Sequence, residues 1–297
     1  MGQVSMGDLK IYRTAVFDNS RWENFESRAD DVFICTPPKC GTTWTQTIVA
    51  NLIHPEGDFP VPIMQLSPWI EAVFVPLEDM LSSLNAQTHR RVMKSHTAAD
   101  GIPWFADAKY IFVGRDGRDA FMSMCNHLER MKKDNVAMLN AQAVAAGIPQ
   151  MPAYDGDPHT FLKIWLENKD NFFNIVATYW ARRSQENLLL VHYGDLKNDL
   201  PGETRRIADF LNVEVTEQQF TSVLERSSFE YMRSHPEMVG DFDIMFEGGI
   251  KGFIFKGTNG RWREVFNEDE LTRYQQRAAE LLSKEAIDWL ETGVEAA

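Results

Sequence analysis

The sequence has 297 residues, of which 44% are hydrophobic and 25% charged, and this composition excludes a chain that is mainly disordered. Its net charge of −13 at pH 7 argues against nonspecific binding of nucleic acid, which needs a basic face to neutralise phosphates. No apolar run approaches the roughly 18–20 residues of a membrane span, and charges near the N-terminus argue against a signal peptide. Three cysteines are too few for a disulfide framework, so we expect a cytoplasmic protein without an integral membrane segment.

Short apolar runs, each followed by a turn or by a helical pattern, predict buried strands at 31–36, 91–95, 109–113 and 187–193. Pro37 and Pro38 end the first run, and apolar residues at helical spacing follow from Trp44 onward. Further helices are expected at about 118–130 and after Pro201, which favours the first turn of a helix. Strands that alternate with helices predict an α/β protein with three layers, in which helices cover both faces of a central parallel sheet.

Two stretches interrupt this alternation. Residues 132–175 contain an alanine-rich helical segment and a loop, and residues 240–260 contain six of the 18 glycines. Long irregular segments inside compact domains are usually lids or binding loops. One amphipathic helix is expected at about 267–290. Since no repeat and no linker is visible, the sequence predicts a single domain over 1–297.

The segment Lys39-Cys40-Gly41-Thr42-Thr43-Trp44 lies between the first strand and its helix. Successive backbone N–H groups at a helix N-terminus form an anion site, to which a lysine adds positive charge and threonines add donors. The lysine precedes the glycine by two residues, and no Gly-x-x-x-x-Gly-Lys occurs, so this is not a Walker A loop. We therefore predict a site for a phosphate or an analogue, with an ordinary strand–helix turn as the alternative.

This segment resembles the 5′-phosphosulfate loop of the cytosolic-type sulfotransferases, whose usual form is Pro-Lys-Ser-Gly-Thr-Thr-Trp. Three more segments resemble motifs of that family in the same order, and together they span residues 30–266. They are Val92-Met-Lys94-Ser95-His96, then Gly114-Arg115-Asp116-Gly117-Arg118-Asp119 with Ser123, and Lys256-Gly257-Thr258-Asn259-Gly260-Arg261-Trp262-Arg263. Within this family, the sequence most resembles bacterial members that act on glycolipids or aryl alcohols. The resemblance implies the sulfotransferase variant of the P-loop-NTPase-like fold.

The resemblance also implies a reaction, in which a sulfuryl group passes in line from 3′-phosphoadenosine 5′-phosphosulfate (PAPS) to a hydroxyl acceptor. The acceptor would be a phenol, an alcohol or a glycolipid, and adenosine 3′,5′-bisphosphate would be the product. Lys39 would stabilise the leaving oxygen, His96 would be the general base and Lys94 would stabilise the transferring group. Ser123 completes the catalytic set, and no metal is expected.

The match to the family's motifs further implies which residues bind the nucleotide. Arg115 and Ser123 would hold the 3′-phosphate beside the loop formed by Lys39, Cys40, Gly41, Thr42, Thr43 and Trp44. Tyr193, Ser228, Phe229, Phe255, Lys256 and Gly257 would line the rest of the site. Cys40 replaces the usual serine, and Phe255 stands where the family usually has an arginine. One 3′-phosphate contact is then missing or moved, with Arg261 and Arg263 as the candidates.

Two segments would close over the ligands: the insertion near 132–175 over the acceptor, and a lid near 236–263 over the 3′-phosphate and adenine. Candidates for an aromatic acceptor pocket are Trp69, Phe74, Trp104, Tyr154 and Trp165. Two alternatives stay open at this point. One is a Mg-dependent nucleotide or small-molecule kinase of the P-loop type, and the other is a non-catalytic nucleotide-binding relative.

Overall fold

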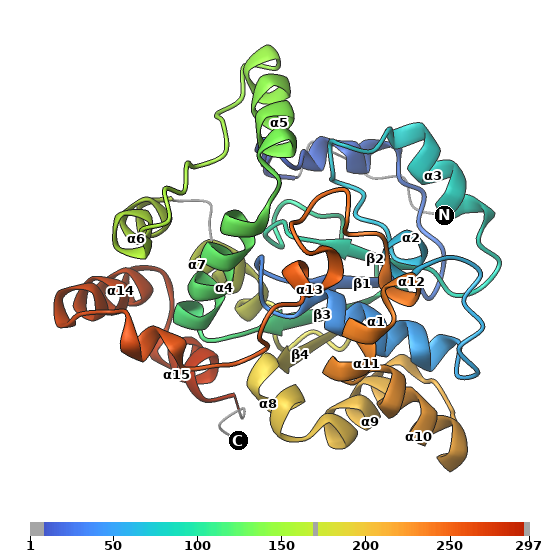
Figure 1. The fold of residues 1–297 in the computed structure, drawn as a ribbon. Coiled ribbons are helices and arrows are strands. Elements are labelled where there is room, and N and C mark those ends of the chain that lie inside the picture. The colour runs from blue at the N-terminus through green and yellow to red at the C-terminus, as the bar shows by residue number, and fades with distance from the viewer. Residues whose placement is uncertain (1–8, 169–171, 294–297) are drawn as a thin grey trace.

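A computed structural model describes residues 9–168 and 172–293, so three residues of the predicted 132–175 insertion lie outside the described part (Figure 1). One sheet has the strand order β2-β1-β3-β4, and all three of its strand pairs are parallel. Its strands are β1 (Val32–Cys35), β2 (Val92–Ser95), β3 (Lys109–Gly114) and β4 (Leu188–His192). The predicted strands are therefore confirmed to within one residue at each end.

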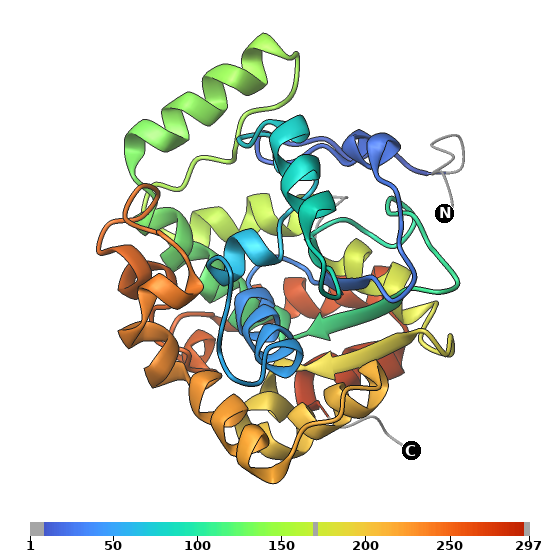
Figure 2. The ribbon, with the colours of Figure 1, turned by 90° about the vertical axis from the view of Figure 1, so that its right-hand side faces the viewer.

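Each strand of this sheet is buried on both faces, which explains why the strands are continuous apolar runs rather than alternating ones. In β1, Phe33 and Cys35 belong to one apolar cluster, while Val32 and Ile34 belong to another. The first cluster also draws on α4, α6, α7, α14 and α15, and the second on α1, α9 and α10. Two views of the ribbon show these helices on opposite sides of the sheet (Figures 1 and 2). The three-layer α/β prediction is confirmed.

A third, smaller apolar cluster is formed away from the sheet by α5, α11, α12 and α13. No helix within the described ranges is both long and apolar enough to cross a membrane. The helices, including the 3₁₀ helices η2 and η3, are η2 (Asn19–Asn24), α1 (Thr42–Ile53), α2 (Ile63–Leu66), α3 (Leu77–Ala86), α4 (Gly117–Arg130), α5 (Lys133–Ala145), α6 (Pro158–Glu167), α7 (Phe172–Trp180), α8 (Tyr193–Asn198), α9 (Leu200–Leu211), α10 (Glu217–Arg226), α11 (Phe229–Ser234), α12 (Pro236–Val239), α13 (Gly249–Phe253), η3 (Arg261–Glu264), α14 (Glu268–Leu281) and α15 (Lys284–Thr292).

The prediction of one final helix over 267–290 is wrong, because the chain forms α14 and α15 with a break between them. Leu282 is extended, with φ −120° and ψ 147°, and so ends α14. The Ser283 side chain then accepts a hydrogen bond from the backbone N–H of Ala286 and caps α15. The apolar spacing continues across the break and conceals it, although the serine is a recognisable start signal.

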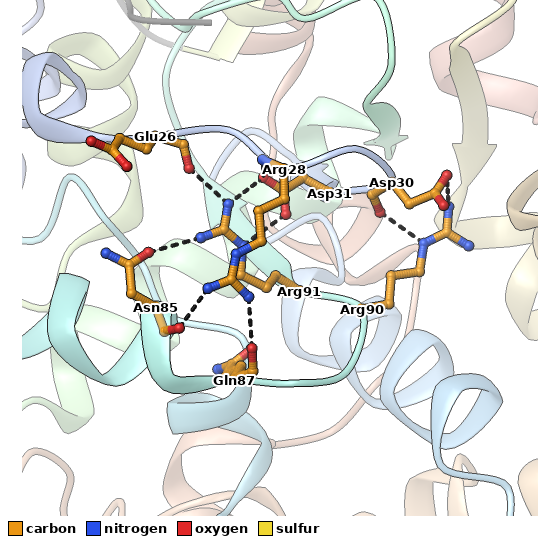
Figure 3. A network of polar contacts seen from close by, with 8 residues as sticks. All are labelled: Glu26, Arg28, Asp30, Asp31, Asn85, Gln87, Arg90 and Arg91. Carbon is orange, nitrogen blue, oxygen red and sulfur yellow. Dashed lines mark hydrogen bonds and ion pairs between the residues drawn. The ribbon is translucent and has the colours of Figure 1, made fainter. Parts of the chain in front are cut away.

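The amino ends of β1 and β2 are joined by a buried ion pair (Figure 3). The Arg91 guanidinium donates to both carboxylate oxygens of Asp31, at 2.8 and 2.6 Å, and both side chains are 1% exposed. Arg91 also donates to the Glu26 carbonyl and to the Asn85 side chain. This network connects the N-terminal segment and the last turn of α3 to the starts of β1 and β2. It holds the end of the sheet that lies opposite the predicted ligand-binding edge.

We expect Arg91→Met to lower the free energy of unfolding by about 3–5 kcal/mol, because it leaves the Asp31 carboxylate buried without its partner. Arg205→Met is the matched control, since Arg205 pairs with Glu217 at an exposed site and its loss should cost about 0–1 kcal/mol. Urea denaturation of both variants measures the difference. Equal losses in the two variants would contradict this assignment.

Candidate active site

The carboxyl ends of the four parallel strands meet at one edge of the sheet, which is where open α/β sheets bind their ligands. The turn that contains Lys39 follows β1, His96 follows β2, Arg115 follows β3 and Tyr193 follows β4. Four segments that lie far apart in the sequence therefore converge at this edge. The prediction that they form one site agrees with this placement.

The turn between β1 and α1 has the backbone shape of an anion cradle. Lys39 and Gly41 have positive φ values of 74° and 102°, and α1 begins immediately afterwards at Thr42. The first N–H groups of a helix have no partner within the helix and are available to an anion. The Thr42 hydroxyl lies 2.6 Å from that of Thr36, which fixes the end of β1 to the start of α1. A Cβ atom at Gly41 would lie 2.8 Å from the Tyr193 ring, so only glycine fits there.

Cys40 contributes to this turn through its backbone rather than its thiol. Its side chain is fully buried in the larger apolar cluster, and burial raises the pKa of the thiol to about 12. The thiol is therefore neutral and faces the core. Any contact of this residue with a ligand would have to come from the main chain.

His96 is held in the tautomer that a general base requires. Its Nδ1 lies 2.9 Å from the backbone carbonyl oxygen of Thr36, so Nδ1 carries the proton and donates it. The basic nitrogen is then Nε2. Removal from water lowers the pKa of His96 to about 3, with a further lowering from the nearby charges of Lys94 and Lys39. The imidazole is consequently neutral at neutral pH.

A buried carboxylate that the sequence analysis missed, Glu71, organises the surroundings of His96. Glu71 has no exposed surface, and its oxygens accept hydrogen bonds from Trp22 Nε1, Trp69 Nε1, the Ser95 hydroxyl and the His96 backbone N–H at 2.9, 2.8, 2.6 and 3.3 Å. Lys94 Nζ lies 4.7 Å from the centre of the Trp69 ring. Burial lowers the pKa of Lys94 to about 8, and the Glu71 charge opposes that shift. No motif surrounds Glu71, so only the fold reveals its role.

Lys39 is the most strongly perturbed cation of the site. Burial, together with the charges of Arg115 and Lys94, lowers the pKa of its ammonium to about 7. Its Nζ lies 3.1 Å from Nδ1 of His127 and 4.7 Å from the centre of the Phe253 ring. His127 was not among the predicted residues. Its position four residues after Ser123 on α4 is the one signal that could have identified it.

Arg115 connects the cradle to the predicted lid. One guanidinium nitrogen donates to the Lys39 carbonyl at 3.0 Å and another to the Asn259 side chain at 2.8 Å, while the guanidinium lies 4.2 Å from the centre of the Tyr193 ring. The Asp119 carboxylate accepts a hydrogen bond of 2.7 Å from the backbone N–H of Gly260. The segment 256–263 is thus attached to the start of α4 at two points. Ser123 lies further along that helix and is half-buried.

The structure distinguishes between the two arginines that could compensate for Phe255. The Phe255 ring lies beneath the Arg130 guanidinium at 4.0 Å. Arg263 is exposed and covers the Trp262 ring at 4.5 Å, whereas the pKa of Arg261 is lowered by burial and then by the charge of Arg115. Among the described residues, the Nε groups of Arg115 and Arg261 are buried and have no hydrogen-bond partner. Arg261 is therefore the better candidate for the moved contact.

The residues predicted to line the nucleotide also lie near one another. Trp44 packs edge-on against Tyr193 at 5.4 Å between ring centres, and its Nε1 donates to the Ser227 carbonyl at 2.8 Å. Gly257 has a φ of 60°, and a Cβ there would lie 2.7 Å from the Phe229 ring. The carbonyl of Gly257 accepts a hydrogen bond from Lys197. Lys256 lies over Phe255, with its Nζ 5.3 Å from the ring centre, while the hydroxyl of Ser228 caps α11.

The five aromatic candidates for the acceptor pocket separate into two groups. Trp69 lies edge-on to His96 at 5.0 Å between ring centres, and Phe74 packs on Trp69. The other three pack elsewhere: Trp104 stacks on Tyr110 of β3, Trp165 packs against Phe121 of α4, and Tyr154 packs against Phe161 of α6. Of the five, Trp69 and Phe74 have the position that an acceptor site needs.

Comparison with known proteins agrees with this geometry. A family model described as "Sulfotransferase domain" matches residues 29–285. A glycolipid sulfotransferase of Mycobacterium bovis is 30% identical over 97% of this chain and 96% of that protein, and human sulfotransferase 1C2 is 26% identical over 92% and 91%. Among solved structures, retinol dehydratase in complex with androsterone and PAP has a TM-score of 0.69 at 21% identity, covering 90% of this chain and 87% of that one. Mouse sulfotransferase SULT7A1 with PAP has a TM-score of 0.67 at 20% identity, covering 89% and 87%. These structures have the same fold.

We expect Gly41→Ala to lower the free energy of unfolding by about 2–4 kcal/mol, because it combines a left-handed backbone with a clash against Tyr193. Gly147→Ala is the matched control, since Gly147 also has a positive φ but nothing lies within 4 Å of an added Cβ. That variant should lose about 1 kcal/mol. Thermal unfolding of both proteins provides the comparison, and a loss no larger at position 41 would show that the close approach is unimportant.

Proposed function

The chain belongs to the sulfotransferase-domain family, and on that premise we propose that it transfers a sulfuryl group from PAPS to a hydroxyl acceptor. Membership of this family supports a sulfotransferase and does not favour the Mg-dependent kinase. The family model matches residues 29–285, and this range includes every predicted site residue. Within the described residues, no group of three or more His, Cys, Asp or Glu is placed to hold a metal ion.

The observation that carries this proposal is the convergence of Lys39, Lys94 and Arg115 at the carboxyl edge of the sheet. Lys94 and Arg115 are 8% and 5% exposed, and the charges of both lower the pKa of Lys39. Cations that repel one another in a poorly solvated site are stabilised when a multiply charged anion enters. PAPS carries a sulfate and two phosphates, and so supplies several negative charges to this edge.

Different residues would bind the 5′-phosphosulfate, the 3′-phosphate and the adenine of the donor. The turn Lys39–Thr43 suits the 5′-phosphosulfate, because it combines free helix N–H groups with an ammonium. Arg115, Ser123, Lys256, Gly257 and Arg261 suit the 3′-phosphate. Four arginine Nε groups are buried without a partner among the described residues, those of Arg115, Arg130, Arg233 and Arg261, and the donors of Arg115 and Arg261 are available to this phosphate. Trp44 and Tyr193 beside the turn, and Phe229 beside Gly257, offer aromatic rings to the adenine.

The proposed mechanism is an in-line displacement at sulfur. His96 Nε2 removes the proton from the acceptor hydroxyl, the oxygen bonds to sulfur, and the bond from sulfur to the bridging oxygen breaks. Lys39 stabilises the negative charge that develops on that oxygen, and Lys94 stabilises the transferring group. Burial keeps the pKa of His96 low in the donor-free protein, and the charges of Lys94 and Lys39 contribute to this lowering. The anionic donor offsets both charges and so raises the basicity of His96 once it binds.

We propose that the acceptor is a hydroxyl on an apolar molecule, and the glycolipid sulfotransferase at 30% identity supports a lipid-linked one. The third apolar cluster packs beside His127 through Phe246 and Phe253, and six of the 13 methionines belong to it or pack on it. Methionine is flexible and adapts to irregular apolar ligands. This cluster and Trp69 together would bind the apolar part of the acceptor.

The insertion near 132–175 and the lid near 236–263 contact each other beside this cluster. The backbone N–H of Lys132 donates to the Met245 carbonyl at 3.0 Å, and Met131 forms a bridge with Phe246. The Asn135 side chain donates to the Ile244 carbonyl at 2.7 Å. These contacts support an acceptor site enclosed by the insertion near 132–175 and the lid near 236–263. In both views α5 projects from the body of the protein beside this region (Figures 1 and 2).

We also propose a cytoplasmic protein with a single domain that binds no nucleic acid. Three free, buried thiols at Cys35, Cys40 and Cys125 support a reducing compartment. The net charge of −13 disfavours nucleic acid, and two apolar clusters that pack on opposite faces of the same sheet support one domain.

Adenosine 3′,5′-bisphosphate should stabilise the protein against thermal unfolding without added Mg²⁺. At about 100 times its dissociation constant, a ligand adds about 2.7 kcal/mol to the stability of the folded state, which is readily measured. ATP is the matched comparison, with and without Mg²⁺, because it lacks the 3′-phosphate that Arg115 and Arg261 would bind. Stabilisation only by ATP with Mg²⁺ would refute the proposed donor and favour a kinase.

His96→Ala should lower turnover by about 100-fold or more while adenosine 3′,5′-bisphosphate still binds, because only the base is lost. Turnover can be followed with 4-nitrophenol or a detergent-dispersed glycolipid as acceptor. His159→Ala is the control, since His159 is half-exposed and pairs with Glu270 on α14. Turnover of the His96 variant close to that of the control would remove His96 from the role of base.

A further inference from the structure

His127, on α4, is a histidine to which the proposed mechanism assigns no role. Its Nδ1 lies 3.1 Å from Lys39 Nζ, although the two residues are 88 positions apart in the sequence. The His127 ring packs against Phe246 and Phe253, with ring centres 4.8 and 6.0 Å away, and the same Phe253 ring lies beneath the Lys39 ammonium. The lid segment therefore encloses the histidine and the lysine together.

The direction of this hydrogen bond follows from chemistry. An ammonium has no lone pair, so the imidazole must be the acceptor whenever Lys39 is charged. His127 is then neutral, with its proton on Nε2. Removal from water lowers the pKa of His127 well below its usual value, and the charges of Lys39 and Lys94 and the neighbouring His96 add to that shift. The neutral form is thus maintained through neutral pH.

Within residues 9–168 and 172–293, the ammonium of Lys39 has no hydrogen-bond acceptor other than His127. Arg115 and Lys94 repel the ammonium, and the Cys40 thiol is neutral because burial raises its pKa to about 12. The Phe253 ring face attracts the cation, but a ring accepts no conventional hydrogen bond. Nδ1 of His127 is therefore the group whose lone pair favours the charged form of Lys39 before any anion arrives.

A neutral partner suits a lysine that must later bind an anion. A carboxylate at this position would hold the ammonium as an ion pair and would repel the sulfate and phosphates of a donor. An anion adds charge–charge attraction to its hydrogen bond with the ammonium, which a neutral imidazole cannot do, so an anion displaces the imidazole. The contact holds Lys39 without blocking the site.

We propose that His127 is a positioning residue for Lys39, which holds the ammonium in the donor-free enzyme and releases it to the anionic donor. This inference rests on the function proposed above. It assigns to His127 a contact with Lys39 alone, and no proton transfer to or from the substrate.

A pH dependence follows from this contact, and its sign can be worked out. The charged form of Lys39 binds the anion, so affinity is greatest below the pKa of Lys39 in the free protein, about 7, and declines as pH rises through it. Loss of the imidazole acceptor lowers that pKa further, so the decline begins at lower pH. Lys94, with a pKa of about 8, adds a second decline that the variants share with the wild type, and His96 stays neutral throughout.

The test measures the affinity for adenosine 3′,5′-bisphosphate by calorimetry between pH 6 and pH 9. His127→Leu removes the acceptor, while His127→Asn places a carboxamide oxygen close to the position of Nδ1. We expect the decline of affinity to begin about one pH unit lower in the leucine variant, which corresponds to the loss of one hydrogen bond to a charged group. The asparagine variant should return it toward the wild-type position. His54→Leu, a partly buried histidine beside His89 and Phe59, is the control.

The possible results distinguish a failure of the proposed function from a failure of the role proposed for His127. Failure of the wild type to bind the bisphosphate would refute the proposed function itself. Binding with the same pH profile in the wild type and the leucine variant would overturn only the role of His127. An equal shift in the leucine and asparagine variants would also overturn it, because a packing effect does not distinguish an acceptor from its absence. Should the leucine variant not fold, His127→Met also lacks a strong acceptor, and the same criteria apply to it.

Discussion

Positive charge that is largely withdrawn from water is the constraint on which the site depends. Lys39, Lys94 and Arg115 lie at the carboxyl edge of one sheet, and burial and then the charges of Arg115 and Lys94 make the charged form of Lys39 less favourable. The protein stabilises them with weak partners: the Trp69, Phe253 and Tyr193 ring faces, backbone carbonyls and an imidazole. Glu71 offsets part of the charge, but its oxygens are already taken up by four hydrogen bonds. Weak partners leave the cations with unused capacity to bind an anion.

At the opposite edge of the same sheet, a buried arginine has a different set of hydrogen-bond partners. Arg91 has a carboxylate partner that accepts two hydrogen bonds, together with a carbonyl and an amide oxygen. Arg115 instead donates to the Lys39 carbonyl and the Asn259 side chain, and its buried Nε has no partner among the described residues. The satisfied arginine fixes the starts of β1 and β2, and that rigid base holds the ends of the strands in register. The unsatisfied arginine lies where a ligand has to be bound.

Local sequence patterns were sufficient for the strands, for the turn between β1 and α1 and for the order of the segments around it, because each depends on a few neighbouring residues. These patterns did not predict the features that depend on packing between distant segments. The break between α14 and α15 lies within an uninterrupted apolar spacing. Glu71 carries no motif, and its importance comes from four donors that only the folded chain brings together. Arg261 and Arg263 are equivalent in the sequence, yet in η3 the first is partly buried and the second is exposed.

The overall charge of the chain and the local charge of the site have opposite signs, and distance determines which one a ligand meets. At physiological ionic strength, charges more than about 8 Å apart are largely screened, so the net charge of −13 has little effect on an anion already inside the site. Within the site the poorly solvated cations are screened far less, and their attraction for an anion is correspondingly stronger. An anion that stays at the surface meets the acidic chain, whereas one that reaches the cradle meets Lys39, Lys94 and Arg115. Position therefore decides the attraction: the three cations bind an anion strongly only once it has reached the turn between β1 and α1.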